Sequence, residues 1–449
     1  MSVALYSQFG SSDTPAIGLL GNHDAAYVVN FVDDDDRLDH GVDQILEELC
    51  GRGLEPSEVA IDLLIVAATI NAADTRILRR SSLDGWTREI ALYIPVSQPA
   101  LWNAAAEHLA RMLKFLTGDY WSFNFRERPE DCAYLAYEPE EVEIETIDVV
   151  SLFSGGLDSF IGAIDLIASD QRPLFISHYW DGEASAAQNS LLGALREHFG
   201  EDSFDSIRAR IGFDAAALAT SGVEPTQRAR SFLFYSMATI AADTLPGDVD
   251  VVIPENGLIA LNVPMEPLRL GALSTRTAHP FFITCMGELV QHIGLSPHFE
   301  NPYRFKTKGE MVSECRDLAF LEATAPDSMS CSSPAKVRWQ GAAPQHCGHC
   351  VPCLIRRASL HTGLSANDET LYFLDDLRTG ILDSKRAEGK DIRSFLFALK
   401  ALSQNPDSAR FLVRKPGPLD PADIQAYADV YSRGMDEVAT LLKGVKASH

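Results

Sequence analysis

One stretch of this 449-residue chain has the residue types and spacing to hold a phosphate group. It reads Ser154, Gly155, Gly156, Leu157, Asp158 and Ser159. Adjacent glycines allow backbone conformations in which peptide N–H groups face an anion, and the two serines add hydroxyl donors. A helix that begins in the loop adds unpaired N–H groups and the positive end of its dipole. We therefore expect an anion-binding loop, in which Asp158 positions a metal ion or caps the helix.

The sequence on either side of this loop favours a strand before it and a helix after it. Residues 147–153 are almost uniformly apolar, which is typical of a strand buried on both faces of a parallel sheet. The apolar residues of 160–167 then recur at helical spacing. The loop is neither a Walker A motif nor a dinucleotide fingerprint, because it lacks their lysine and their glycine spacing. The alternative interpretation is a serine–glycine turn in an ordinary α/β protein.

Four of the eight cysteines are spaced like the ligands of one tetrahedral metal ion: Cys331, Cys347, Cys350 and Cys353. Four thiolates without an open position are typical of a structural zinc site. Three histidines are alternatives for the fourth ligand: His346, His349 and His361. An iron–sulfur cluster and unligated thiols are the other interpretations. The four scattered cysteines are expected to be buried thiols in a reducing compartment: Cys50, Cys132, Cys285 and Cys315.

Residues 146–364 alternate between strand-like and helix-like segments, which favours an α/β fold with a doubly wound parallel sheet. Further strands are expected at 173–179, 207–213 and 249–253, and helices at 184–199 and 228–244. Ligands of such sheets bind beyond the carboxyl ends of the strands. That rule selects His178 after one strand, and Glu255 and Asn256 after another, with simple turns as the alternative. Arg276, in the segment that follows, is a further candidate for substrate binding.

The two ends of the chain are expected to form separate units. Residues 1–145 are interpreted as an α+β domain of unknown role, and residues 365–449 as a helical C-terminal extension. The expected N-terminal strands are 27–32, 90–96 and 121–126, and the helices are 40–49, 59–72 and 101–116. The expected C-terminal helices are 369–382, 392–402 and 420–442. Three N-terminal arginines are interpreted as solvated loop residues, with contact to a partner as the alternative: Arg79, Arg80 and Arg88.

Composition excludes some classes of function. The formal net charge of −25 disfavours binding to nucleic acid, because such a surface repels a phosphate backbone. The strongest apolar run, residues 59–70, is too short to span a bilayer and contains Asp62. The first residues lack the pattern of a secretory signal. We therefore expect a cytoplasmic protein that is not a membrane protein.

The loop, with its flanking strand and helix, resembles the PP-loop of the N-type ATP pyrophosphatases, which split ATP into AMP and pyrophosphate. A PP-loop followed about 190 residues later by C-G-H-C-x-x-C resembles the QueC family of 7-cyano-7-deazaguanine synthases. This resemblance covers about Ile147 to His361. It implies an adenine nucleotide alpha hydrolase-like fold, ATP and Mg²⁺ as cofactors, and a structural Zn²⁺. The implied reaction converts 7-carboxy-7-deazaguanine to the nitrile with ATP and ammonia.

The resemblance also implies roles for single residues. The loop from Ser154 to Ser159 would bind ATP, together with His178 and Arg230. The catalytic candidates are Asp158, Lys308 and Arg228. Lys308 would steady phosphate charge, and an ordinary surface lysine is the alternative. Arg228 and Arg230 match the arginine segment beside the nucleotide, and Arg356 matches the position after the zinc cysteines.

Two departures from the family leave the substrate open. Residues 179–183 lack the family's glutamine and histidine, and residues 255–280 differ from its substrate loop. The layout with extra regions at both ends resembles the longer QueC-like proteins of bacterial anti-phage operons such as the Qat system. It implies protein partners from the same operon, and a protein amine as an alternative acceptor to ammonia. A tRNA thiolase and a nucleotide-binding subunit without catalysis are the other interpretations.

Overall fold

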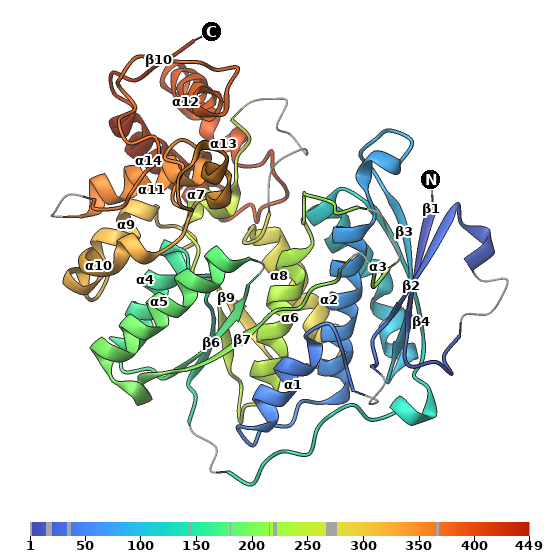
Figure 1. Cartoon of the computed structure of the whole chain (residues 1–449). Helices are drawn as coiled ribbons and strands as arrows, with labels where there is room; N and C mark the ends of the chain where they lie inside the picture. Colours follow the sequence, from blue (N-terminus) through green and yellow to red (C-terminus); the bar gives the residue numbers. More distant parts are fainter. Residues whose placement is uncertain are drawn as a thin grey trace.

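The computed structural model describes residues 2–14, 20–33, 37–142, 146–179, 181–214, 216–218, 222–265, 276–364 and 368–448. Two parallel sheets with helices between them form most of the molecule (Figure 1). A group of helices from the C-terminal part of the chain lies at one end, above the second sheet in this view. No described helix is both long enough and apolar enough to cross a bilayer.

The N-terminal sheet has four parallel strands in the order β2-β1-β3-β4. They are β1 (Ser2–Gln8), β2 (Ala25–Asn30), β3 (Glu89–Val96) and β4 (Tyr120–Glu127). This region is therefore α/β, and the expected α+β class is wrong for it. The edge strand β4 alternates between buried and exposed residues, a pattern more typical of antiparallel sheets. The inner strand β1 was not predicted; five of its seven residues are buried.

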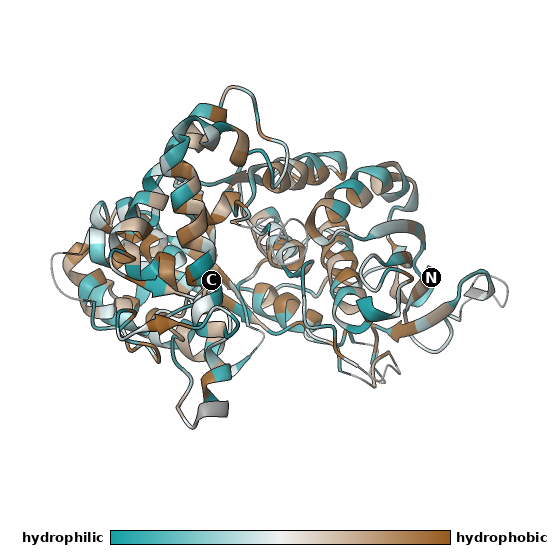
Figure 2. Ribbon diagram, turned by 90° about the horizontal axis from the view of Figure 1, so that it is seen from above, coloured by the Kyte–Doolittle hydropathy of each residue, from teal (hydrophilic) through white to brown (hydrophobic). Residues whose placement is uncertain are grey.

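The helices of this region are α1 (Val42–Cys50), α2 (Glu58–Arg76) and α3 (Pro99–Thr117). Of the 19 residues of α2, 18 are buried, because α2 packs on β3 and also on α6 (Arg230–Asp243) of the second sheet. The helix α3 likewise packs on β4 and on α8 (Pro280–His292). One hydrophobic core therefore runs through both sheets. Figure 2 shows this from above, with brown, hydrophobic ribbon on helices in the middle of the molecule.

A buried network of ion pairs lies at the C-terminal end of α2. The Arg88 guanidinium donates to Asp74 at 2.6 Å and to Asp119 at 2.7 Å, and Arg79 donates to both carboxylate oxygens of Asp119 at 2.9 Å. All four residues are at most 3% exposed. The expectation of solvated loop arginines is therefore wrong for Arg79 and Arg88, whereas Arg80 is exposed. A carboxylate that is removed from water needs a cationic partner. The local sequence does not show which residue that partner is.

The second sheet has five parallel strands in the order β7-β6-β5-β8-β9. They are β5 (Val149–Leu152), β6 (Pro173–His178), β7 (Asp205–Ala209), β8 (Asp250–Val252) and β9 (His298–Glu300). The helices α4 (Leu157–Ile167) and α5 (Gly182–Phe199) join the first three strands, and α6 and α8 join the others. The parallel α/β sheet expected for residues 146–364 is confirmed. Its strand order reverses between β5 and β8, the place where doubly wound sheets bind ligands.

The polypeptide beyond β9 forms the helical part at one end of the molecule. Its helices are α9 (Lys308–Ser313), α10 (Leu318–Thr324), α11 (Val351–Gly363), α12 (Ala387–Gln404), α13 (Ala409–Leu412) and α14 (Ile424–Leu441). The helix α14 packs on α11 and on α7 (Gly257–Leu261), which follows β8. Two short strands, β10 (Ile381–Leu382) and β11 (Lys446–Ala447), pair in parallel.

Two of the three helices expected in the C-terminal extension are confirmed, as α12 and α14. The helix expected at 369–382 is wrong. Phe373 donates its backbone N–H to the carbonyl of His346, and Leu374 donates to that of Cys347. These bonds tie the segment to the cysteine loop and replace the hydrogen bonds of a helix.

The buried network makes a prediction about stability. Replacing Arg88 by methionine leaves Asp74 and Asp119 with less compensation, and we expect a loss of about 3–5 kcal/mol in the free energy of unfolding. The measurement is chemical denaturation of the full chain. The matched control is Arg80→Met, at an exposed arginine, which should change stability by less than about 0.5 kcal/mol. Equal stability of the two variants would contradict the network.

Candidate functional site

The predicted anion-binding loop lies at the reversal point of the second sheet, between β5 and α4. Gly155 has a φ of +79°, which favours glycine, and a Cβ there would lie 3.1 Å from Cγ of Gln188. Gly156 is the N-cap of α4, and its N–H donates to Oγ of Ser154 at 3.3 Å. The hydroxyls of Ser154 and Ser159 are 3.1 Å apart. The loop therefore has the tight backbone and the hydroxyl donors that the sequence predicted.

Four of the predicted site residues meet in the first turn of α4. Lys308 Nζ lies 3.0 Å from Oδ1 of Asp158, and Nδ2 of Asn256 donates to Oδ2 of Asp158 at 2.7 Å. Glu255 lies beside Asn256, with Oε1 3.5 Å from the same amide nitrogen. Asp158, Asn256 and Lys308 are each at most 6% exposed. The structure thus brings together residues that are far apart in sequence.

The two carboxyl groups of this cluster have opposite electrostatic environments. Burial alone would raise the pKa of Asp158, but the Lys308 ammonium and hydrogen bonds from its neighbours hold that pKa below its usual range. Burial and the negative charge of Asp158 raise the pKa of Glu255 well above its ordinary value. These surroundings therefore favour the ionised form of Asp158 beside the lysine and the protonated form of Glu255.

Close packing fixes the elements that carry this cluster. A Cβ on Gly162 of α4 would lie 2.5 Å from Cβ of Pro254, so only glycine lets α4 approach the end of β8. Asn256 also caps α7, since its Oδ1 accepts the N–H of Ile259 at 3.0 Å. Thr307 caps α9 in a capping box with Glu310, which places Lys308 at the first helical position.

His178, at the end of the strand that pairs with β5, lies close to the positive charge of Arg230. His178 ends β6, and its Nε2 is 3.1 Å from the carbonyl of Ile211. Burial, followed by the positive charge of Arg230, lowers the pKa of His178 to about 4, so the imidazole is neutral at pH 7. Gln188 of α5, which the sequence analysis missed, lies 3.4 Å from both the Ser154 and the His178 carbonyls. Its only sequence signal is a polar residue on the buried face of a predicted helix.

Arg228 and Arg276 pack elsewhere, against the N-terminal region. The Arg228 guanidinium lies 4.6 Å from the ring centre of Trp86, and that of Arg276 lies 4.5 Å from the ring centre of Phe115. Burial, followed by the charge of Arg79, lowers the pKa of Arg228 to about 10. Among the described residues, the structure does not place either guanidinium in the Asp158 cluster. Residues 266–275, within the expected substrate segment, lie outside the described part of the chain.

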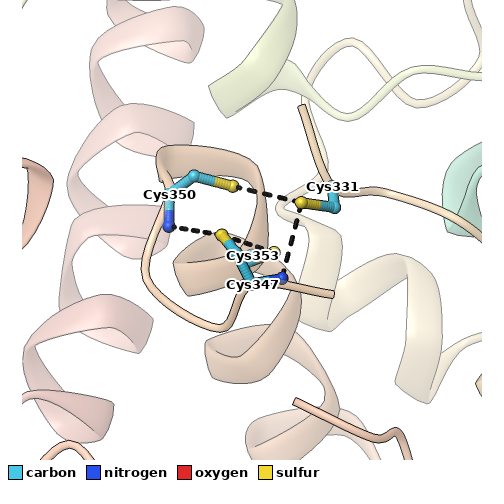
Figure 3. A group of neighbouring side chains, drawn as sticks. All are labelled: Cys331, Cys347, Cys350 and Cys353. Carbon is cyan, nitrogen blue, oxygen red and sulfur yellow. Dashed lines mark hydrogen bonds between the residues drawn. The ribbon is translucent and has the colours of Figure 1, made fainter. Parts of the chain in front are cut away.

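The four predicted metal ligands converge on one point, as Figure 3 shows. The Sγ atoms of Cys331 and Cys350 are 4.0 Å apart, and those of Cys347 and Cys353 are 3.9 Å apart. Tetrahedral zinc with Zn–S bonds of about 2.3 Å separates its sulfurs by about 3.8 Å, so the spacing fits. The N–H of Cys350 points at Sγ of Cys347 at 3.4 Å, an arrangement that stabilises a thiolate. These residues could hold a structural zinc ion, and no histidine is needed as a fourth ligand.

The cysteine loop is attached to the anion-binding loop. The backbone N–H of Met329 donates to the carbonyl of Gly155 at 2.8 Å. Arg356 of α11 is fully buried and donates to Oγ of Ser328 at 2.7 Å and to the carbonyl of Ala325 at 2.6 Å. Arg356 therefore organises the segment that precedes Cys331. Arg356 was expected from the resemblance described above, whereas Met329 was not, since a backbone contact leaves no signal in residue type.

No protein-family model matches the chain, and no curated protein matches it. The site is therefore interpreted from its own geometry.

The raised pKa of Glu255 predicts how stability depends on pH. A carboxyl group whose pKa is higher in the folded than in the unfolded protein costs stability as pH rises from its unfolded pKa, 4.5, through its folded pKa. Glu255→Gln removes this cost. We expect the variant to melt at a higher temperature than wild type at pH 8, and at the same temperature as wild type near pH 4.5. A difference that does not change with pH would contradict the assignment.

The cysteine cluster predicts bound zinc. After dialysis against metal-free buffer, we expect about one tightly held zinc ion per chain by elemental analysis, and loss of that ion in Cys347→Ser. The variant should also melt at a lower temperature, because zinc affinity contributes to folding. The matched control is Cys50→Ser, outside the cluster, which should keep the ion. Zinc retained at wild-type level by Cys347→Ser would contradict the site.

Proposed function

We propose that this protein is a PP-loop enzyme that uses ATP to adenylate a carboxylate and then transfers the acyl group to nitrogen. The substrate class is a 7-carboxy-7-deazaguanine or similar deazapurine acid, as in the QueC family that the sequence resembles. The product is an amide, or a nitrile after a second, ATP-driven dehydration. The acceptor is ammonia or an amine of a protein partner from an anti-phage operon.

One observation carries this proposal. The loop from Ser154 to Ser159 lies where the strand order reverses, and Lys308 meets it there from α9. An anion-binding loop at this place is the usual position for a nucleotide in a doubly wound sheet. A buried lysine beside the helix N-terminus adds positive charge where phosphates are held. A simple serine–glycine turn would give no reason for a lysine at this position.

The proposed reaction assigns a task to each group. A carboxylate oxygen of the substrate attacks the α-phosphorus of ATP, and pyrophosphate leaves. Loop N–H groups, the hydroxyls of Ser154 and Ser159 and the Lys308 ammonium stabilise charge on that leaving group. The nitrogen nucleophile then attacks the acyl carbon, AMP leaves, and the nitrogen loses a proton.

Asp158 positions Lys308 through their ion pair. The carboxylate oxygens of Asp158 fit the hard-ligand preference of Mg²⁺, which would neutralise phosphate charge when bound. The four-cysteine group fits a structural role for zinc, because four thiolates leave no open position for a substrate.

The test is release of AMP and pyrophosphate from ATP and Mg²⁺, with and without 7-carboxy-7-deazaguanine and ammonium. We expect AMP formation that depends on the deazapurine. Lys308→Met should lower the rate by about 100-fold or more, because it removes a charge at the leaving group. The matched control is Lys306→Met, two residues away at a lysine paired with Glu314, which should keep wild-type turnover.

Three outcomes distinguish the interpretations. A primary amide or a nitrile of the deazapurine identifies ammonia as the acceptor. AMP without either product indicates a protein amine, and the intact mass of each operon partner would then show the added deazapurine. ATP binding without AMP formation, even with the operon partners present, would contradict the enzyme and leave a nucleotide-binding subunit.

A further inference from the structure

A group of metal-binding side chains lies between α3 and α8, outside the site described above. His108 comes from α3, and Cys285 and Glu288 come from α8. One ligand atom from each residue lies within 4.8 Å of the other two. The distance from Nδ1 of His108 to Oε2 of Glu288 is 3.6 Å. Ligand atoms around a tetrahedral zinc ion are about 3.3–3.8 Å apart, so small side-chain movements would bring all three to one ion.

The histidine is already oriented as a ligand. Nε2 of His108 is 2.7 Å from the backbone carbonyl of Cys285, and a carbonyl oxygen can only accept, so Nε2 carries the hydrogen. Nδ1 faces the donor Nη2 of Arg111 and therefore presents its lone pair on the side of Glu288. Metal-binding histidines typically donate their other N–H to a carbonyl in this way. The ring of His292 stacks on that of His108, with centroids 5.5 Å apart, and steadies its plane.

Arg111 lies where an ion would bind between His108 and Glu288. Its Nη2 lies 3.2 Å from Nδ1 of His108 and 3.4 Å from Oε2 of Glu288. The Arg111 side chain is 59% exposed, so it can turn into solvent at little cost. The Cys285 residue is only 1% exposed, whereas the Glu288 side chain is 46% exposed, so the group has a buried thiol and an open approach.

We propose that His108, Cys285 and Glu288 form a second metal site, for Zn²⁺ or a similar borderline divalent ion. One thiolate, one imidazole and one carboxylate are a mixed ligand set that suits zinc, with water at the fourth position. Binding turns Arg111 outward and releases the thiol proton of Cys285. The ion joins α3 of the N-terminal sheet to α8 of the second sheet. This site is independent of the adenylation reaction.

The test is a Co²⁺ titration of the full-length protein that holds zinc only in its four-cysteine group. We expect one Co²⁺ per chain to bind, with a thiolate-to-cobalt absorption band in the near ultraviolet. Cys285→Ser should lose this band. The matched control is Cys315→Ser, at a buried cysteine outside both metal groups, which should keep it.

Arg111→Ala gives a second, independent readout at an exposed position. Removing the competing cation should tighten Co²⁺ binding by about two- to fivefold. Absence of a second Co²⁺ equivalent in wild type, or an unchanged band in Cys285→Ser, would overturn the proposal. So would unchanged or weaker binding in Arg111→Ala. If Cys285→Ser fails to fold, as judged by circular dichroism, the wild-type stoichiometry and Arg111→Ala decide the question.

Discussion

The contact between Asp158 and Lys308 joins the parts of the candidate site. Asp158 lies in the first turn of α4, within the predicted anion-binding loop, and also accepts a hydrogen bond from the side-chain amide of Asn256 at the end of β8. A buried carboxylate is costly unless it is paired and hydrogen-bonded, and this one has both kinds of partner. Three segments from distant parts of the sequence are thereby fixed relative to the loop. Without Lys308, Asp158 would lose the charge that offsets its burial.

The segment that precedes the cysteine cluster contacts the same loop. Met329, two residues before Cys331, donates its backbone N–H to the carbonyl of Gly155. A metal ion that closes the cysteine loop would therefore also fix the backbone at Met329, which bonds to Gly155. The loop leads into α4 and also bonds to the cysteine segment. An irregular segment can in this way help to fix the backbone of the predicted anion-binding loop.

Local signals in the sequence predicted local features well. Two glycines between an apolar run and a helical pattern located the loop, and the spacing of Cys347, Cys350 and Cys353 located the cluster. The rule that ligands lie beyond strand ends identified Glu255 and Asn256, from the sequence alone, as candidates for the ligand edge of the sheet. It needed only the order of strands and helices, which periodicity supplies.

What the sequence did not reveal depends on tertiary packing. Arg228 is the first residue of a predicted helix near the ligand edge, but its guanidinium stacks on Trp86, because the start of a helix has several faces and only packing decides between them. The buried roles of Arg79 and Arg88 depend on Asp119, which lies some 30–40 residues away in the chain. Gln188 and Met329 contact the loop through carbonyl and N–H groups that every residue type carries. The parallel arrangement of the N-terminal sheet was not predicted, because alternation of buried and exposed residues does not report strand direction.

The double packing of α2 affects how the chain is made on the ribosome. The face of α2 that meets α6 cannot be covered until Arg230 and the rest of α6 have left the exit tunnel, about 150 residues after Arg76. At roughly 5–20 residues per second, this interval lasts about 8–30 s. During that time a long apolar helix face is open to solvent in the nascent chain. A helix buried on all sides in the finished protein is thus an exposed apolar surface while the chain is being made, and such surfaces favour aggregation.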